Sequence, residues 1–199
     1  MDPNLQFVQC PPDPQCLEEI QKHSTSARLS HNVRSTVEIV KFVRSLLQAD
    51  LGISRIDGFG VQVTLRKVSQ SEHECAAALE LVEAALAEGV HPADIAILGP
   101  DGAKGPVCSS LLRRIPELLQ ALSPEGRIQS RVHGIVASLE AFRGLEARVV
   151  VLVDLHRLAH DHSGKSALYT GITRATASLN LLVSPPFNDF VKGLLDGSV

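Results

Sequence analysis

The chain has 199 residues, of which 44% are hydrophobic and 21% are charged, the balance of a folded globular protein rather than of a disordered one. Aromatic residues make up 4% of the chain, with no Trp, so a single-strand binder built on rows of stacked aromatic side chains is not expected. The net charge of −3 argues against a protein that binds duplex nucleic acid through general electrostatic attraction.

Cysteine usage and hydropathy indicate the compartment. The cysteines show no CxxC spacing, which is typical of free thiols in a reducing environment; they are Cys10, Cys16, Cys75 and Cys108. No apolar run approaches the ~18 residues of a membrane span, and the polar, proline-bearing N-terminus does not resemble a signal peptide. We therefore expect an intracellular protein, in the nucleus or cytoplasm, that does not contact a membrane.

The chain divides into a short connector and one folded domain. Residues 1–26 contain a run of helix-breaking prolines and are expected to be an irregular connector, followed by a domain over 27–199. The domain begins with a predicted helix that Ser35 or Thr36 caps and Gly52 ends.

Alternating strand and helix patterns fill the rest of the domain. They predict strands that alternate with helices and therefore an α/β fold, doubly wound around a mostly parallel sheet. Ligands of such sheets bind beyond the carboxyl ends of the strands. In chain order we expect a strand over 61–68, a helix over 71–88, a strand over 94–99, a helix over 109–122 that Pro116 kinks or splits, a strand within 131–137, a strand over 149–154, a helix around Ala167–Ala175, a strand over 178–184 and a closing helix.

One local motif resembles the end of a phosphate-binding P-loop. Gly164, Lys165 and Ser166 match its last three residues. The pattern also requires a glycine five positions before Gly164, where this chain has Ala159, and a hydrophobic strand just upstream, where the chain is polar. We interpret the motif as a turn at the start of a helix.

A second local feature is a segment rich in histidine. Several of its side chains are of the types that bind zinc or manganese, but their spacing fits no standard site. They are Asp154, His156, His160, Asp161 and His162. An unrelated small-molecule α/β enzyme that uses this segment therefore remains an alternative.

Three arginines stand in loops after expected strand ends, and a Gly–Leu–Glu turn stands directly before the strand over 149–154. The planar guanidinium of Arg34, Arg143 or Arg174 can bind phosphate and stabilise charge in phosphoryl transfer, although a single loop arginine more often forms a surface salt bridge. Gly144 allows a close backbone approach to a ligand, and Glu146 can accept a ribose hydroxyl.

Four segments follow one another along the chain: LSHNVRSTVEIVKFV, HPADIAILGP, SLEAFRGLEARVVVLVD and ALYTGITRATASLNLLV. Together they resemble the C-terminal RecA-like domain of superfamily 1 helicases of the UvrD/RecD-like group, in which the first, third and fourth correspond to motifs IV, V and VI. The resemblance covers residues 27–184 and implies a RecA-like P-loop NTPase fold without its own P-loop. No large insertion separates the strand over 94–99 from the later motifs, as in compact members such as the helicase-like domains of Schlafen or nuclease-related-domain proteins.

The resemblance implies a nucleotide site shared with a first RecA-like domain, present in cis or in trans. ATP with Mg²⁺ would lie between the two domains, and Arg34 and Arg174 would be catalytic residues that reach its γ-phosphate. Glu146 would bind the ribose, with Gly144 tracking the nucleotide beside it. Gln6 resembles the glutamine of motif III, although one extra residue precedes it and an irregular polar terminus would account for it equally well.

The resemblance also implies a surface for single-stranded DNA or RNA. Ser138 would bind a phosphate of the strand, and Arg143 and Thr173 would belong to the same surface, Thr173 by supporting the loop of Arg174. Glu140 stands where motif V has a histidine and Arg143 where it has a lysine. The motif therefore keeps one positive charge and gains a negative one.

The chain lacks a Walker A and a Walker B sequence, and these hold the phosphates and the magnesium ion in helicases. We therefore expect a second motor domain that hydrolyses no ATP alone and binds no metal by itself. The alternative is a non-catalytic regulatory module, derived from a helicase, that binds nucleic acid or a partner protein.

Overall fold

The computed structural model describes residues 18–19, 22–23, 31–32, 35–48, 53–54, 63–69, 71–123 and 130–196. The expected connector over 1–26 lies almost wholly outside these residues, so its boundary stays a prediction. None of the described helices combines the length and the apolar character that a membrane span requires.

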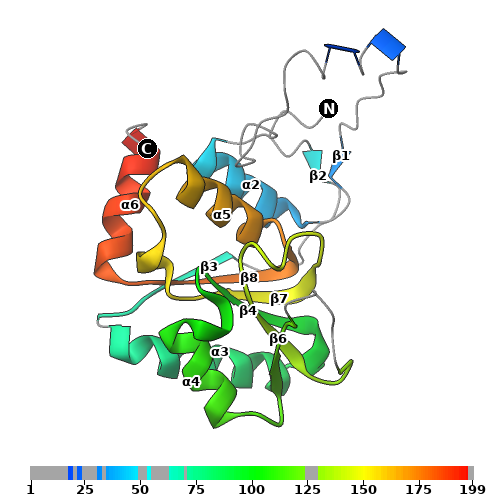
Figure 1. The fold of residues 1–199 in the computed structure, drawn as a ribbon, viewed down its shortest axis with the longest axis vertical. Coiled ribbons are helices and arrows are strands. Elements are labelled where there is room, and N and C mark those ends of the chain that lie inside the picture. Colours follow the sequence, from blue (N-terminus) through cyan, green and yellow to red (C-terminus); the bar gives the residue numbers. More distant parts are fainter. Residues whose placement is uncertain are drawn as a thin grey trace.

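A six-stranded sheet forms the centre of the domain, in the order β3-β8-β7-β4-β6-β5 (Figure 1). Every pairing within it is parallel, which confirms the α/β fold expected from the alternation of strands and helices. A separate parallel pair joins β1 (His31–Asn32) to β2 (Ile53–Ser54). The six strands are β3 (Val63–Lys67), β4 (Ile95–Gly99), β5 (Leu119–Ala121), β6 (Gly134–Ser138), β7 (Ala147–Leu152) and β8 (Ala175–Val183).

Helices cover both faces of the sheet. Figure 1 shows α2, α5 and α6 on one face and α3 and α4 on the other. The helices are α2 (Val37–Leu47), α3 (Ser71–Ala87), α4 (Pro106–Arg114), α5 (His162–Ile172) and α6 (Pro185–Asp196), with single 3₁₀ turns η2 (Pro92–Asp94), η3 (Gly102–Lys104) and η4 (Leu155–Arg157).

The two-sided packing explains the continuous apolar strands. In β4, Ala96 and Leu98 pack into the cluster under α2, α5 and α6, whereas Ile95 and Ile97 pack into the cluster under α3 and α4. Because successive side chains of a strand point to opposite faces, a strand buried on both faces must be apolar throughout.

The helix predicted after Ser35 forms as α2. Its predicted apolar stripe is buried in full: Ile39, Val40, Val43, Leu46 and Leu47. Thr36 is its N-cap, but the helix ends at Leu47, where Gln48 adopts a left-handed φ of 54°. The expectation that Gly52 ends the helix is therefore wrong, since a residue in this conformation already interrupts the helical hydrogen bonds.

The helix predicted over 109–122 is wrong at both ends. Helix α4 begins at Pro106, whose missing N–H is tolerated at a first helical position, and ends at Arg114. Pro116 disfavours helical backbone at the preceding Ile115 and cannot donate to the helix. The chain therefore turns and enters β5 at Leu119.

The boundary between the helix predicted around Ala167–Ala175 and the next strand is also shifted. Helix α5 begins at His162, because the Asp161 carboxylate accepts hydrogen bonds from the Ser163 and Gly164 N–H groups. Strand β8 begins at Ala175 rather than at residue 178, since Ala175 pairs with Ala147 of β7. Tertiary pairing here extends the strand into the predicted helix.

Candidate functional site

Arg174 lies at the amino edge of the sheet, between the end of α5 and the start of β8. Three oxygen atoms hold its half-buried guanidinium. Nε donates to the Thr170 carbonyl at 3.2 Å, Nη1 to the Leu145 carbonyl at 3.4 Å and Nη2 to the Thr173 hydroxyl at 3.1 Å. The expectation that this arginine follows the carboxyl end of a strand is wrong, because it precedes β8.

Thr173 is buried and supports Arg174 directly. Its hydroxyl lies 2.9 Å from the Tyr169 carbonyl and 3.1 Å from the Thr170 carbonyl, both acceptors in the last turn of α5. The same hydroxyl oxygen accepts the bond from Arg174. The carbonyl end of a helix carries partial negative charge, which favours a cation at this position.

The loop before β7 lies beside Arg174. The Leu145 carbonyl accepts from the Arg174 side chain, and the Ala147 N–H donates to the Arg174 carbonyl at 3.1 Å. Gly144 has a φ of +88° with open space where a Cβ would stand, so backbone conformation rather than crowding requires glycine here. Glu146 is exposed. The structure thus brings Gly144, Glu146, Thr173 and Arg174 together.

Arg143 and Ser138 lie on the segment that leads to this loop. Arg143 is exposed and pairs with Glu140 at 3.6 Å. Ser138 ends β6 and therefore lies at the carboxyl edge, opposite Arg174; its hydroxyl accepts from the Ala141 N–H at 3.0 Å. The chain between them passes over the face of α2, α5 and α6, where Phe142 is buried.

Gln6 and Arg34 lie outside the described residues. Ser35, the first described residue of the α2 segment, donates from its hydroxyl to the Ala175 carbonyl at 3.2 Å, and this hydrogen bond is buried. This hydrogen bond therefore joins the start of α2 to the start of β8, next to Arg174.

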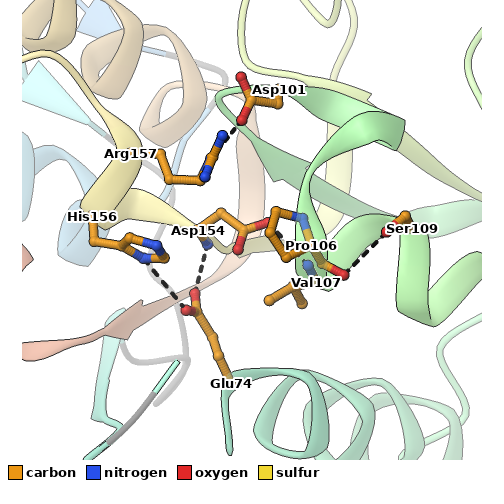
Figure 2. A network of polar contacts seen from close by, with 8 residues as sticks. All are labelled: Glu74, Asp101, Pro106, Val107, Ser109, Asp154, His156 and Arg157. Carbon is orange, nitrogen blue, oxygen red and sulfur yellow. Dashed lines mark hydrogen bonds and ion pairs between the residues drawn. The ribbon is translucent and has the colours of Figure 1, made fainter. Parts of the chain in front are cut away.

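A buried polar cluster lies at the carboxyl edge of the sheet (Figure 2). Asp154 follows β7 with a left-handed φ of 55°. Its Oδ2 accepts from the Val107 N–H at 3.1 Å, so the carboxylate caps the first turn of α4. A Cβ on Gly105 would lie 2.7 Å from the same oxygen, so this approach requires glycine. A carboxylate of the chain itself thus occupies the anion-binding end of this helix.

Glu74 of α3 is the second member of the cluster and is fully buried. Its Oε1 accepts from the Asp154 N–H at 2.6 Å. Burial, reinforced by the negative charge of Asp154, raises the pKa of Glu74 to about 7, although the hydrogen bond from Asp154 opposes the rise. Burial also raises the pKa of Asp154.

His156 of η4 completes the cluster. Its Nδ1 lies 3.8 Å from Oε2 of Glu74, and both atoms are buried without a hydrogen-bond partner. Arg157, next along the chain, pairs with Asp101 at 2.5 Å. Figure 2 shows these side chains converging from α3, η4 and the turn after β4.

The histidine-rich segment does not converge as a whole. His160 stacks on Phe190 with ring centroids 5.1 Å apart. Asp161 caps α5, and hydrogen bonds from the Ser163 hydroxyl and from the first N–H groups of the helix lower the pKa of Asp161. Among the described residues, three potential metal ligands meet only at Glu74, Asp154 and His156.

The Gly164-Lys165-Ser166 motif lies inside α5 and follows η4 and a loop rather than a strand. A Cβ on Gly164 would lie 1.8 Å from the Ala159 carbonyl oxygen. This glycine therefore serves close packing against its own preceding loop, which agrees with the interpretation of the motif as a helix start.

Sequence reasoning missed Glu74. The residue lies 80 positions before Asp154, in a helix where a glutamate is expected to face solvent. The rule that polar groups meet beyond the carboxyl ends of parallel strands could have indicated Asp154, which follows the apolar strand, but nothing local to Glu74 marked it as buried.

Comparison with known proteins gives two findings. Residues 133–182 match the family model of the UvrD-like helicase C-terminal domain. The fold is similar to a crystal structure of the C-terminal domain of a possible DNA helicase from Lactobacillus plantarum, with a TM-score of 0.59 and 18% sequence identity over 82% of this chain and 96% of that one. No curated protein matches the chain.

Proposed function

We propose that the chain is the second motor domain of an ATP-dependent helicase-like protein, since residues 133–182 match the UvrD-like helicase C-terminal domain and the fold is similar to that of a helicase C-terminal domain. It supplies arginines to ATP and Mg²⁺ bound mainly by a first RecA-like domain, in cis or in trans. The observation that carries the proposal is that three hydrogen bonds hold the Arg174 side chain beside the loop of Gly144 and Glu146.

The hydrogen bonds that orient the Arg174 side chain suit a phosphate-binding role. The Thr170 and Leu145 carbonyls and the Thr173 hydroxyl orient the guanidinium. A preorganised cation costs no reorganisation when negative charge develops on a transferring phosphoryl group. Arg174 therefore stabilises that charge, whereas ATP supplies the phosphoryl group that passes to water.

Two neighbouring elements extend the proposed nucleotide-facing edge. Glu146 is exposed beside Arg174, and its carboxylate can accept a ribose hydroxyl. Gly144 keeps the loop in a left-handed turn without a side chain, which permits close approach of a ligand. The hydrogen bond between Ser35 and Ala175 joins the start of α2 to the same edge.

We assign single-stranded nucleic acid to the segment over 138–146. Arg143 is exposed and can contact a phosphate. Ser138 ends β6 at one end of this segment, whereas Gly144 and Glu146 stand at the other. A segment that spans both edges can couple a strand contact to the nucleotide, with Thr173 acting through Arg174.

The experiment is the nucleic-acid-stimulated ATPase rate of this chain combined with its cognate first RecA-like domain. Arg174→Ala should lower kcat on the order of 10³-fold, because the developing charge loses its partner. Arg174→Lys, which keeps the charge and loses the planar fork, should recover only part of the rate.

The matched control is Arg113→Ala, an exposed arginine on α4 on the other face of the sheet. It should leave the rate unchanged, and equal melting temperatures should show that all variants are folded. A folded Arg174→Ala variant that keeps the wild-type rate would refute the proposed role.

One observation favours the alternative, a non-catalytic module that binds a partner or nucleic acid. Glu140 pairs with Arg143 and so reduces the positive charge of the segment assigned to nucleic acid. For this alternative, retention of nucleic acid or of the partner domain should be the same with and without nucleotide. A strong nucleotide dependence would instead favour the motor domain.

A further inference from the structure

We propose that Glu74, Asp154 and His156 bind one divalent transition-metal ion, of the Zn²⁺ or Mn²⁺ class, at the carboxyl edge of the sheet. One ligand atom from each side chain lies within 4.8 Å of the other two. Three protein ligands with nitrogen and oxygen donors, completed by water, are a common arrangement for zinc.

Two orphaned atoms point to the ion. Glu74 has no exposed side-chain surface, and one of its oxygens, Oε2, has no hydrogen-bond partner. The Nδ1 atom of His156, 3.8 Å away, is also buried and unpartnered. Such atoms are costly to bury, and their rarity in native proteins calls for an explanation.

The spacing suits an ion better than a direct hydrogen bond. A separation of 3.8 Å is too long for a hydrogen bond. Two ligand atoms each about 2.1 Å from one ion can be separated by up to about 4.2 Å, so an ion fits between Glu74 and His156. All three ligand atoms lie within 4.8 Å of one another, so small side-chain rotations can bring the remaining atoms within reach of the same ion.

The ligands are already held in place by other groups. Asp154 accepts from the Val107 N–H at 3.1 Å, and Glu74 accepts from the Asp154 N–H at 2.6 Å. Such outer contacts orient metal ligands. The His156 side chain is 21% exposed, which provides a route by which an ion enters from solvent.

Charge and donor type select the class of ion. Two carboxylates are buried together, and the nearby Arg157 pairs with Asp101, so a divalent cation would offset their negative charge. A histidine nitrogen beside carboxylate oxygens favours Zn²⁺ or Mn²⁺ over Mg²⁺ and Ca²⁺, which prefer oxygen ligands only. The proposal replaces the expectation that this chain binds no metal by itself.

The test begins with the full chain, purified without a histidine tag, stripped with a chelator and titrated with ZnCl₂ in a calorimeter. We expect one site per chain with a dissociation constant in the micromolar range or tighter, weaker binding of Mn²⁺ and no binding of Mg²⁺. Saturating Zn²⁺ should raise Tm by roughly 5 °C. Absence of stoichiometric Zn²⁺ binding would overturn the proposal.

Three variants separate this site from the other histidines. Glu74→Gln keeps the acceptor for the Asp154 N–H, and His156→Ala removes the nitrogen ligand; each should weaken Zn²⁺ binding by roughly 100-fold. His160→Ala, in the same loop but stacked on Phe190, should bind as the wild type does. Equal affinity in the wild type and His156→Ala would place the ion elsewhere and contradict the proposal.

Discussion

The two edges of the central sheet are assembled in different ways. At the amino edge, two short continuous segments meet: Arg174 donates to the hydroxyl of the adjacent Thr173 and to the Leu145 carbonyl in the loop of Gly144 and Glu146. At the carboxyl edge, Glu74 and Asp154 meet from segments 80 residues apart. Short motifs therefore describe the first edge, whereas only the folded chain reveals the second.

The edges also differ in burial and charge. Arg174 is half-buried, and its guanidinium donates to the Thr170 and Leu145 carbonyls and to the Thr173 hydroxyl. Glu74 and Asp154 are buried, and Asp154 caps α4 where a phosphate would bind in a P-loop protein. This difference agrees with the proposal that a nucleotide of a partner domain is bound at the amino edge, whereas the carboxylate of Asp154 occupies the helix end at the carboxyl edge.

The largest expected effect on stability is a pH dependence of the free energy of unfolding, which results from Glu74 at the carboxyl edge in metal-free protein. The pKa of Glu74 is raised from 4.5 to about 7 in the folded state, so the folded chain binds more protons than the unfolded chain between these values. The free energy of unfolding should therefore fall as pH rises from about 4.5 to about 7, by up to roughly 3 kcal/mol.

The measurement is denaturant unfolding across this pH range in chelator, for the wild type and for Glu74→Gln. The amide does not titrate, so the difference between the two free energies isolates the glutamate. A difference that stays constant between pH 4.5 and 7 would show that burial does not perturb this carboxyl group.

A smaller effect on the free energy of unfolding is expected at Gly105, which lies against Asp154 of the same buried polar cluster. A Cβ there would lie 2.7 Å from Oδ2 of Asp154 and 3.2 Å from the Gly102 carbonyl oxygen. Gly105→Ala should therefore push the carboxylate away from Val107 and lower the free energy of unfolding by about 2 kcal/mol. Denaturant unfolding checks this, and a stability within error of the wild type would contradict the close approach.

At the amino edge, Gly144→Ala should lower the free energy of unfolding by about 1 kcal/mol, less than Gly105→Ala does. Its φ of +88° is unfavourable for alanine, but nothing lies within 4 Å of the added Cβ. Denaturant unfolding of both variants checks this. The loss of stability in Gly105→Ala measures the effect of a steric clash, and the loss in Gly144→Ala measures the effect of an unfavourable backbone conformation. A larger loss at Gly144 would reverse the order that we expect of the two edges.

The smallest effect is expected for the exposed pair of Arg143 and Glu140, 3.6 Å apart. Glu140→Gln should change the free energy of unfolding by no more than about 0.5 kcal/mol, since exposed ion pairs contribute little. Binding of single-stranded nucleic acid at low salt should strengthen, because a negative charge is removed beside Arg143. Unchanged or weaker binding would argue against nucleic acid at this segment.

Local sequence patterns predicted many of the helices and strands but not where several of them begin and end. The apolar spacing that produces α2 lies within a single helix, so its five buried residues could be predicted. By contrast, β5 follows Pro116 as a three-residue strand, too short for a periodic signal, and β8 begins early because Ala175 pairs with β7. Such boundaries depend on contacts between distant segments.

The two candidate sites also differ in how far the sequence predicts them. Arg174, Gly144 and Glu146 could be predicted because motifs V and VI are continuous in sequence and the parallel pairing of β7 with β8 brings them together. Glu74 could not be predicted, since its burial results from α3 packing against the end of β7. Asp154 had a partial signal, as the polar residue that ends the most apolar strand.

The separate roles of the two edges are tested most directly by measuring the stimulated ATPase rate of the complex with the first RecA-like domain for Arg174→Ala and Glu74→Gln in parallel. The account predicts a loss on the order of 10³-fold for Arg174→Ala and a rate close to that of the wild type for Glu74→Gln. Full activity of a folded Arg174→Ala variant, or an equal loss in both variants, would contradict it.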